Sequence, residues 1–419
     1  MPSSIRRPRQ GSTSIPGAGA PPGWEFLFET AGLDALSRTA GELAGGADPA
    51  KLNTELRRSG LSPDQTAAVL TQATLRLKAR AKFGELAMSL LFTPAGLEQA
   101  TRAGVAARHA ARYRAAECTR VADLGCGIGA ESVALIGAGI TPLPVELDPM
   151  TARIAAHNLG VVAAHHRSPL PEVRLGDAES IGPGDADGVF LDPARRTAGH
   201  SDTRRVSTDG YSPSLEFAFG LARELPTGVK LGPGFDRELI PDEAEAQWVS
   251  VDGQVVETGV WFGLLARPGV KRSALVIRGG EAAELSASED SPDAPIRPRG
   301  EYLYEPDGAV IRARLIGKLA GQIGAGMLSA GIAYLTADRL IPTAFAQPFR
   351  VLDELPVREK ELKRALTERG IGTLEIKKRG ADVDPAALRT RLKLRGPNRA
   401  TLFLTREAGS HVALLAERA

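Results

Sequence analysis

The chain has 419 residues, of which 43% are hydrophobic and 24% charged, and its formal net charge is +2. The length suits two or three domains with packed cores, and no overall charge points to a polyanionic partner. The cysteines, Cys118 and Cys126, are too few for a disulfide framework or a zinc cluster, and no histidine pair has metalloprotease spacing, so no metal is expected.

Residues 1–23 are rich in Pro, Gly and Ser, which predicts a disordered tail. The arginines at positions 6, 7 and 9 precede no apolar run, so no secretory signal is expected. The longest weakly polar run, 319–335, is short and rich in glycine, which argues against a membrane span. These features predict a cytoplasmic protein without a membrane partner.

Residues 24–117 have the pattern of a helical region. Ser62-Pro63-Asp64-Gln65 combines a capping serine, a proline at the first helical position and a glutamine three residues after the cap, which predicts a helix to about Ala81. Thr93-Pro94 repeats the cap-then-proline signal and predicts a second long helix that continues to Arg112.

From residue 118 to 280 strands and helices alternate. The expected strands are 121–124, 143–147, 173–175 and 188–191, with helices at 131–137 and 150–159. Further strands are expected at 228–231, 254–265 and 273–277, the last two antiparallel. This order predicts an α/β fold with a Rossmann-like, doubly wound parallel sheet.

The C-terminal third is predicted to contain a connecting segment and a small module. Residues 281–298 are polar and rich in Ser, Asp and Pro, so 281–346 is expected to be a linker and connecting segment. Residues 347–419 alternate between short strands and helices, which predicts a small α/β module. This module holds 16 Lys+Arg and 10 Asp+Glu, a net charge of +6, whereas residues 1–346 have a net charge of −4.

A glycine-rich loop, Asp123-Leu-Gly-Cys-Gly-Ile-Gly129, stands between the first predicted strand and the helix that follows. Its glycines permit a sharp turn and a close approach to a ligand, and the helix N-terminus offers free N–H groups. Glu146 lies 19 residues after Gly127, at the end of the second strand, where a carboxylate can accept hydrogen bonds from both ribose hydroxyls of an adenosine ligand.

Two readings of this loop compete, a dinucleotide site and an S-adenosylmethionine (SAM) site. The spacing is Gly-x-Gly-x-Gly, and Ala130 occupies the third glycine position of the dinucleotide fingerprint. Asp123 stands two residues before the first glycine, where it can hold the amino end of methionine. The loop therefore favours SAM. The expected cofactor-binding residues are Asp123, Gly125, Gly127, Gly129, Glu146 and Asp177.

Acidic residues also end the third and fourth predicted strands, at Asp177 and Asp192. Ligands of open α/β sheets bind at the carboxyl ends of the strands, so both acids are expected at the site. Asp177 can accept from the adenine amino group, although an acid after a strand is equally often a helix N-cap. Asp148, before Pro149, is expected to be such a cap.

Residues 118–280 resemble the class I SAM-dependent methyltransferases in the sequence and order of these motifs. Asp192-Pro193-Ala194-Arg195-Arg196 stands where nucleic-acid and amino methyltransferases of that class carry Asp/Asn-Pro-Pro-Tyr/Phe. The resemblance implies that Asp192, Pro193 and Arg195 face the substrate. The stacking aromatic ring of the family is missing, and an arginine plane can stack on a base or pair with a phosphate instead.

A basic cluster marks the C-terminal module. Its members are Lys377, Lys378, Arg379, Arg391 and Lys393. Such groups supply phosphate contacts to RNA, although one basic face is often only solvated. Phe403 is the only aromatic residue after Phe349, so the sequence does not predict base stacking on aromatic rings.

Residues 24–419 are similar to actinobacterial methyltransferases with a THUMP-like C-terminal domain. The similarity rests on the glycine loop, on 192–196, on Leu91–Thr101, and on 376–380 together with 402–406. It implies an RNA partner, tRNA or rRNA, without naming the methylated atom. Two alternatives stay open: a small-molecule methyltransferase, and an RNA-binding protein with an inactive SAM fold. No oligomeric state is predicted.

Overall fold

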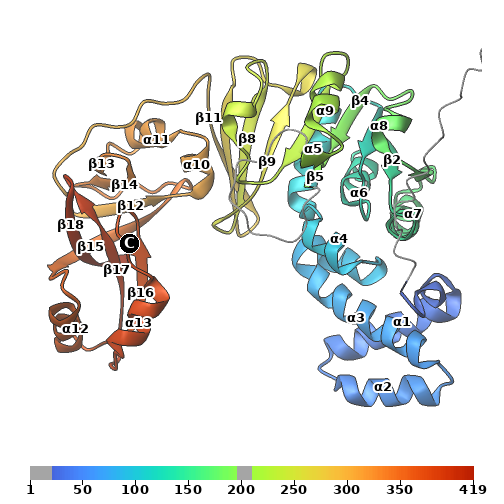
Figure 1. Cartoon of the computed structure of the whole chain (residues 1–419), viewed down its shortest axis with the longest axis horizontal. Helices are drawn as coiled ribbons and strands as arrows, with labels where there is room; N and C mark the ends of the chain where they lie inside the picture. The colour runs from blue at the N-terminus through green and yellow to red at the C-terminus, as the bar shows by residue number, and fades with distance from the viewer. Residues whose placement is uncertain (1–20, 196–209) are drawn as a thin grey trace, which may run out of the picture. The chain divides into compact units, whose positions relative to one another are not determined.

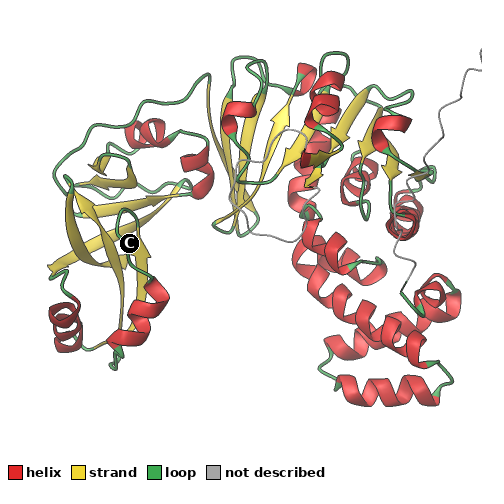
Figure 2. Cartoon of the chain, viewed as in Figure 1, coloured by secondary structure: helices red, strands yellow, loops and turns green. Residues whose placement is uncertain are grey.

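The computed structural model describes residues 21–195 and 210–419 (Figure 1). They fall into two compact units, residues 21–195 with 210–225 and residues 226–419. Both units combine helices with β-sheets (Figure 2), which confirms the predicted α/β class. No helix in the described ranges is long and apolar enough to span a bilayer.

The first unit opens with a helical region. Its elements are η1 (Trp24–Phe28), α1 (Thr30–Ala44), α2 (Pro49–Arg58), α3 (Pro63–Phe83), η2 (Gly84–Ser89), α4 (Pro94–Gln99) and α5 (Ala103–Ala115). The predicted capping box is present, because Gln65 N–H donates to Ser62 Oγ at 3.2 Å and Ser62 N–H donates to Gln65 Oε1 at 2.9 Å. It fixes the start of α3, the longest of these helices.

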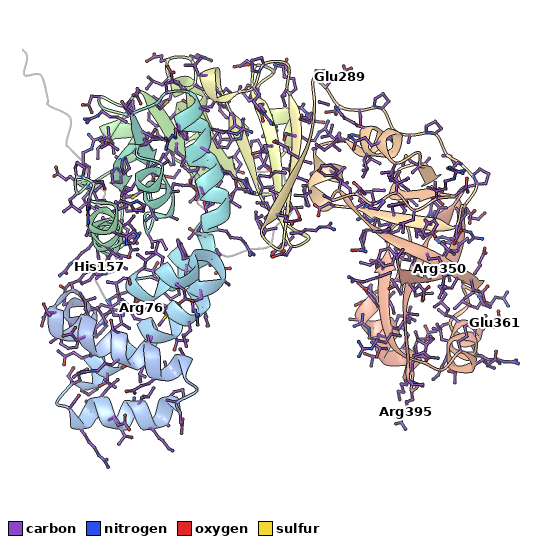
Figure 3. All side chains as sticks on the ribbon, turned by 180° about the vertical axis from the view of Figure 1, so that it is seen from behind. Arg76, His157, Glu289, Arg350, Glu361 and Arg395 are labelled. Atoms are coloured by element: carbon purple, nitrogen blue, oxygen red, sulfur yellow. The ribbon has the colours of Figure 1, made fainter. Side chains whose placement is uncertain are left out.

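Buried polar side chains of α3 hold the segment that leads into α4. Gln72 exchanges two hydrogen bonds with the backbone of Phe92, at 2.5 and 3.1 Å. Arg76, labelled in Figure 3, donates to the carbonyl oxygen of Leu90 at 2.9 Å, and burial lowers the pKa of its guanidinium to about 10. These bonds satisfy backbone groups that lie outside any helix or strand.

The prediction of one long helix from Pro94 to Arg112 is wrong. The structure divides it into α4 and α5. The ammonium group of Lys82, in α3, donates to three carbonyl oxygens at the end of α4 at 2.5 to 2.8 Å. Because these carbonyls find a donor outside their own helix, the chain can leave the helical path there.

Four parallel strands form the sheet of the first unit, in the order β4-β1-β2-β3. The strands are β1 (Arg120–Leu124), β2 (Thr141–Glu146), β3 (Arg174–Leu175) and β4 (Gly188–Leu191). The connecting helices are α6 (Ala130–Gly137), α7 (Pro149–His166) and α8 (Ala178–Ile181). A short pair, β5 (Ala194–Arg195) with β6 (Tyr211–Ser212), and helix α9 (Leu215–Leu221) follow. The predicted alternation is confirmed, and all four strands end at the same edge.

The second unit begins with a mixed sheet in the order β11-β10-β8-β9-β7. The strands are β7 (Thr227–Leu231), β8 (Glu245–Val251), β9 (Gln254–Trp261), β10 (Arg272–Arg278) and β11 (Glu281–Ala287). β9 is antiparallel to its neighbours, as expected, whereas β10 runs parallel to β8. The start of the expected linker is instead strand β11, because Gly279 and Gly280, at φ 55° and 88°, form a two-residue hairpin turn.

The rest of the second unit is a seven-stranded sheet in the order β13-β14-β12-β15-β18-β17-β16. Its strands are β12 (Tyr302–Pro306), β13 (Gly326–Ser329), β14 (Ile332–Ala337), β15 (Ala346–Leu355), β16 (Ile371–Lys378), β17 (Asn398–Glu407) and β18 (Ser410–Arg418). Helices α10 (Gly308–Arg312) and α11 (Ile316–Gln322) lie between β12 and β13 in the chain. β12 pairs with β15, so the segment expected to connect the domains supplies strands to the C-terminal sheet.

Helices α12 (Glu359–Glu368) and α13 (Pro385–Leu392) pack on the C-terminal part of this sheet. Leu362 of α12, Leu388 of α13 and Leu402 of β17 belong to one buried apolar cluster. The opposite face of β17 contributes Phe403 to a second cluster with Phe349. Consecutive apolar residues, such as Leu402 and Phe403, therefore bury both faces of β17.

Candidate functional site

The glycine loop turns directly after β1. Gly125, Gly127 and Gly129 have φ values of 86°, 55° and 87°, a backbone region in which side chains are strained. A Cβ atom on Gly127 would meet nothing within 4 Å, so the loop is open at this point. The loop is thus an open backbone cradle, and its binding of SAM stays a prediction.

The carboxylate of Glu146, at the end of β2, is bonded to this loop. Gly127 N–H donates to Glu146 Oε2 at 2.9 Å, and Asp148 N–H donates to Oε1 at 2.9 Å. Burial raises the pKa of Glu146, and the backbone hydrogen bonds oppose that shift. Each carboxylate oxygen can accept a further hydrogen bond, so the group can still receive two hydroxyls.

Asp123 is the most buried acid of the predicted site, with an exposed fraction of 1%. The backbone N–H and the hydroxyl of Ser132 donate to its Oδ2 at 3.1 and 2.6 Å. Burial raises the pKa of Asp123 to about 7; the Ser132 bonds lower it, and the charges of Glu131 and Asp192 raise it. A cation placed beside Asp123 favours its ionised form.

Asp177 is the N-cap of α8. It accepts from Glu179 N–H at 3.3 Å and from the Ser180 hydroxyl at 2.9 Å. The side chain is exposed at the end of β3, so capping leaves lone pairs available to a ligand. Asp148 is the predicted cap of α7 and accepts from Thr151 N–H at 2.8 Å.

Asp192 and Pro193 follow β4 directly, at the same edge of the sheet as the loop. The Asp192 carbonyl oxygen lies 3.9 Å from the position of a Cβ on Gly125. The structure therefore brings the Asp192–Pro193 step next to the glycine loop. Arg195 lies in β5, paired with Tyr211, while its side chain and the whole of Arg196 fall outside the described residues.

Asn158 of α7 was not predicted as a site residue. Its amide Nδ2 donates to the carbonyl oxygens of Leu91 at 3.0 Å and Ile128 at 2.9 Å, and its Oδ1 accepts from Leu91 N–H at 2.8 Å. The side chain is 1% exposed. Asn158 therefore holds the glycine loop against the helical region. The one sequence signal was an asparagine inside an apolar helix, where it is a poor helix former.

Two exposed leucines lie at the same edge of the sheet as these acids. Leu147 follows β2 and is 51% exposed, and Leu175 ends β3 and is 56% exposed. Leu175 is the register partner of Glu146, so both leucines flank the acid expected to bind a ribose. Large apolar side chains exposed beside a polar group can line a pocket for a planar ring. The sequence predicts only the acids at these strand ends as site residues, because an exposed leucine carries no signal of its own in the sequence.

The basic cluster of the C-terminal module is partly neutralised by acids. Lys377 Nζ lies 2.6 Å from Glu305 Oε2 and 3.1 Å from Glu375 Oε1, and Arg379 lies 3.7 Å from Glu305. The guanidinium of Arg391 donates to both Glu359 oxygens at 3.1 Å. The other two members, Lys378 and Lys393, are exposed and have no ion pair among the described residues. The structure thus divides the five predicted phosphate-binding residues into paired and available ones.

The fold and the cradle define a class I methyltransferase: parallel strands in the order β4-β1-β2-β3, a glycine loop after β1 and an acid at the end of β2. Comparison with known proteins identifies the family. An uncharacterised S-adenosylmethionine-dependent methyltransferase of Mycobacterium tuberculosis (strain CDC 1551 / Oshkosh) is 35% identical over 353 residues, which cover 82% of this chain and 93% of that protein. Its counterpart in strain H37Rv matches equally. This chain belongs to the SAM-dependent methyltransferases, and its methyl donor is SAM.

Two family models and one solved structure extend the match. The THUMP domain-like model matches residues 346–418, and a domain of unknown function (DUF8688) matches residues 22–79. A crystal structure of a protein assigned as a methyltransferase, from Porphyromonas gingivalis W83, has a TM-score of 0.70 and 24% identity. It covers 94% of this chain and 100% of that one, so the fold is shared over most of this chain. The chain is a class I methyltransferase with a THUMP-like C-terminal domain.

The first prediction concerns Glu146. Glu146→Ala removes a carboxylate expected to accept hydrogen bonds from two ribose hydroxyls, and should weaken SAM binding about tenfold to a hundredfold, or about 1.5–3 kcal/mol. Titration calorimetry with SAM measures the change. Glu172→Ala changes an exposed acid that precedes β3 and is not among the predicted contacts, and it should bind SAM like the wild type. Unchanged affinity in Glu146→Ala would remove Glu146 from the site.

The second prediction concerns pH. The raised pKa of Asp123 means that the folded protein without SAM loses stability as the pH rises toward about 7, because ionisation is costly in the buried site. The ammonium group of SAM should favour the ionised form, so binding should release a proton and strengthen as the pH rises through about 7. Above a pH of about 8, deprotonation of that amino group should weaken it again.

Calorimetry in buffers with different ionisation enthalpies detects the released proton. Asp123→Asn carries no titrating carboxylate and should lose both the proton release and the rise in affinity through about pH 7. Equal proton release by the wild type and Asp123→Asn would show that another group titrates.

Proposed function

We propose that this chain transfers a methyl group from SAM to a base of tRNA or rRNA in the cytoplasm. The observation that carries the proposal is the THUMP-like domain at residues 346–418, joined to a methyltransferase fold in one chain. THUMP domains are associated with structured RNA in tRNA-modifying enzymes. The net charge of +6 over residues 347–419 supports an anionic partner.

The proposed cofactor contacts follow the strand ends. Glu146 accepts from the ribose hydroxyls, the glycine loop approaches the methionine part, and Asp123 holds its ammonium group. Asp177 accepts from the adenine amino group, and Leu147 and Leu175 provide apolar walls for the ring. Bound SAM supplies a methyl group on a sulfonium, a good leaving group. The protein's own task is to position donor and acceptor.

Asp192 is proposed to act on the acceptor. An in-line transfer requires the nucleophile on the far side of the methyl carbon from the sulfur. Asp192, at the end of β4 beside the loop, can orient that nucleophile or accept its proton. The carbonyl oxygen of Pro193 offers a second acceptor, and Arg195 contacts the base or a phosphate. The bond to the methyl forms as the carbon–sulfur bond breaks, and S-adenosylhomocysteine leaves.

A small-molecule substrate is the second candidate, and the ion pairs of the basic cluster favour it. Glu305, Glu375 and Glu359 already neutralise three of the five basic residues. RNA binding therefore requires that phosphates replace these carboxylates or that the exposed lysines carry the contact. Substitution of Lys378 and Lys393 therefore distinguishes an RNA substrate from a small-molecule substrate.

The third prediction separates chemistry from cofactor binding. Asp192→Ala should leave SAM affinity close to that of the wild type and abolish most methyl transfer, because Asp192 is proposed to act on the acceptor and not on SAM. Transfer of labelled methyl to RNA from a deletion strain measures the activity, and mass spectrometry of its nucleosides identifies the product. Asp185→Ala, an exposed acid paired with Arg120, is the matched control. Normal transfer by Asp192→Ala would make Asp192 a turn residue only.

The fourth prediction tests RNA binding. Each lost phosphate contact should lower the slope of log K against log salt by about 0.7–0.9, so Lys378→Ala/Lys393→Ala should lower it by about 1.4–1.8. Lys360→Ala/Lys363→Ala, two exposed lysines of α12, should change it little. Filter binding with bulk tRNA measures both. An equal slope in all three proteins would favour the small-molecule candidate. Substitutions are preferred to a deletion at residue 347, which would cut β15 from the sheet.

A further inference from the structure

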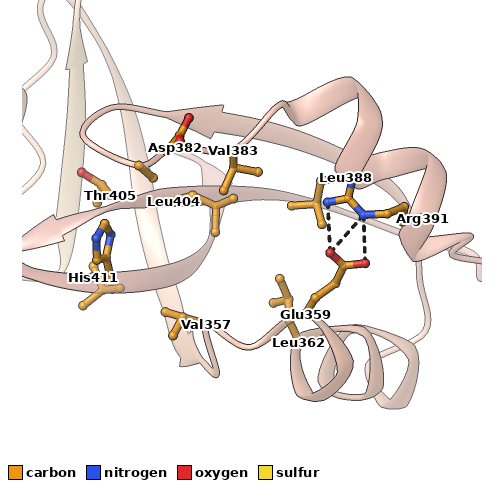
Figure 4. Close-up of a pocket in the computed structure, with 12 residues that line it drawn as sticks. Val357, Glu359, Leu362, Asp382, Val383, Leu388, Arg391, Leu404, Thr405 and His411 are labelled. Atoms are coloured by element: carbon orange, nitrogen blue, oxygen red, sulfur yellow. Dashed lines mark hydrogen bonds and ion pairs between the residues drawn. The ribbon is translucent and has the colours of Figure 1, made fainter.

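Two parts of the chain have no role in the methyl transfer proposed above. One is a mainly apolar hollow between α12, α13 and the β17–β18 hairpin (Figure 4), and nothing among the described residues shows what fills it. The other is the helical region before β1, of which residues 22–79 match a domain of unknown function. Unlike the hollow, the helical region is joined to the glycine loop by hydrogen bonds and apolar contacts.

The segment 89–92, which ends η2 and leads into α4, is held by side chains from two helices. Each of its four carbonyl oxygens lies within hydrogen-bond distance of a different side chain. In the order of the segment these are His157, Arg76, Asn158 and Gln72, at 3.3, 2.9, 3.0 and 2.5 Å. Gln72 and Arg76 belong to α3, whereas His157 and Asn158 belong to α7 (Figure 3 labels Arg76 and His157). This segment, the strap, therefore ties α3 to α7.

Asn158 connects the strap to the glycine loop. Its Nδ2 donates to the Leu91 carbonyl and, at 2.9 Å, to the carbonyl oxygen of Ile128, which stands between Gly127 and Gly129. Its Oδ1 accepts from Leu91 N–H at 2.8 Å. Both amide hydrogens and the oxygen are thus committed, and the strap and the loop cannot shift relative to each other without breaking a bond to Asn158.

The side chain of Ile128 is buried beside the first turn of α4. A Cβ atom on Gly96 would lie 2.5 Å from Ile128 Cγ2, so a larger residue there would displace Ile128 or the capping hydroxyl of Thr93. Thr93 Oγ1 accepts from Gly96 N–H at 2.9 Å, which fixes this turn. Ile128 shares one apolar cluster with Leu91 and Leu97. Residues from the conspicuous motif 91–101 therefore pack against the loop.

Other hydrogen bonds hold the first half of the loop to β2. The N–H groups of Gly125 and Cys126 donate to the Val145 carbonyl oxygen, both at 3.0 Å, and Gly127 N–H donates to Glu146. Asn158 instead holds the second half, at Ile128. A loop that is already fixed in its binding conformation loses less conformational entropy when a ligand binds.

We infer that the helical region contributes to binding of the methyl donor, and that Asn158 is the positioning residue through which it acts on the glycine loop. The inference rests on the proposed placement of SAM at this loop and is independent of the substrate. SAM affinity depends on the bond from Asn158 to Ile128, and bound SAM stabilises the strap in return, because a coupling free energy is reciprocal. The helical region thereby acquires a function in cofactor binding.

The first measurement is SAM affinity, by titration calorimetry on the full chain below the melting temperature of each variant. Asn158→Leu keeps the approximate shape of the side chain and removes its three hydrogen bonds, so it should bind SAM about fivefold to fiftyfold more weakly. The control is Leu52→Ala, which leaves a cavity under α2, a helix that packs on α1 and α3. It should also lower the melting temperature but bind SAM as the wild type does.

The second measurement is hydrogen exchange of the strap, which a purely structural role of Asn158 would not couple to SAM. The N–H groups of Leu91 and Phe92 donate to Asn158 Oδ1 and Gln72 Oε1, so a peptide that covers residues 89–92 reports on both bonds. Saturating SAM should slow exchange in this peptide in the wild type and in Leu52→Ala, but not in Asn158→Leu.

The outcomes separate this inference from the proposed cofactor site. If Glu146→Ala weakens SAM binding and Asn158→Leu does not, the inference is overturned and the site stands. If neither variant weakens it, SAM does not occupy this loop and both fall. An equal loss of affinity in Leu52→Ala and Asn158→Leu would assign the effect to general destabilisation and overturn the inference. Should Asn158→Leu not fold, the wild type decides, since unchanged exchange of the strap with SAM overturns the inference.

Discussion

The hydrogen bond from Gly127 N–H to the Glu146 carboxylate joins the two halves of the proposed cofactor site. It connects the loop after β1 with the end of β2, which lie side by side because the strands are parallel neighbours. Together with the hydrogen bonds from Gly125 N–H and Cys126 N–H to the Val145 carbonyl oxygen, both at 3.0 Å, this bond fixes the loop beside the acid expected to bind a ribose. Gly125, Gly127 and Gly129 all have positive φ values, so the path of the loop past Glu146 depends on its glycines.

The helical region before β1 supports the same loop from the other side. Asn158 bonds both to Leu91 and to Ile128 of the loop, and a Cβ atom on Gly96 would lie only 2.5 Å from the Ile128 side chain. Gln72 and Arg76 hold the segment that carries Leu91. The helical region thus supports the glycine loop, and Gln72 and Arg76 lie within the residues matched to a domain of unknown function.

Local patterns predicted the first unit well, because its site is built from strand ends and from residues near them in sequence. The features that were missed depend on partners far along the chain. The carbonyl groups that Lys82 binds at the end of α4 lie 15 to 18 residues from it in the sequence. Leu91, the partner of Asn158, lies 67 residues from Asn158. Strand β12 is recognisable only through its pairing with β15, about 45 residues later, and its alternation alone is weak. The acids that pair with the basic cluster, such as Glu305, were missed for the same reason, because they lie far from it in the sequence.

Those acids change how the basic C-terminal charge should be understood. A net charge of +6 counts Lys377 and Arg391 fully, yet each faces a carboxylate at 2.6 to 3.0 Å. An RNA phosphate must compete with that carboxylate, so the gain from each exchange is smaller than that of a free lysine contact, and the displaced acid must be solvated again. Lys378 and Lys393 are exposed and have no paired carboxylate to displace, so they should dominate the electrostatic part of RNA binding. If this module binds RNA as proposed, its charge therefore supplies only a moderate affinity, and the remaining affinity and selectivity must come from uncharged contacts.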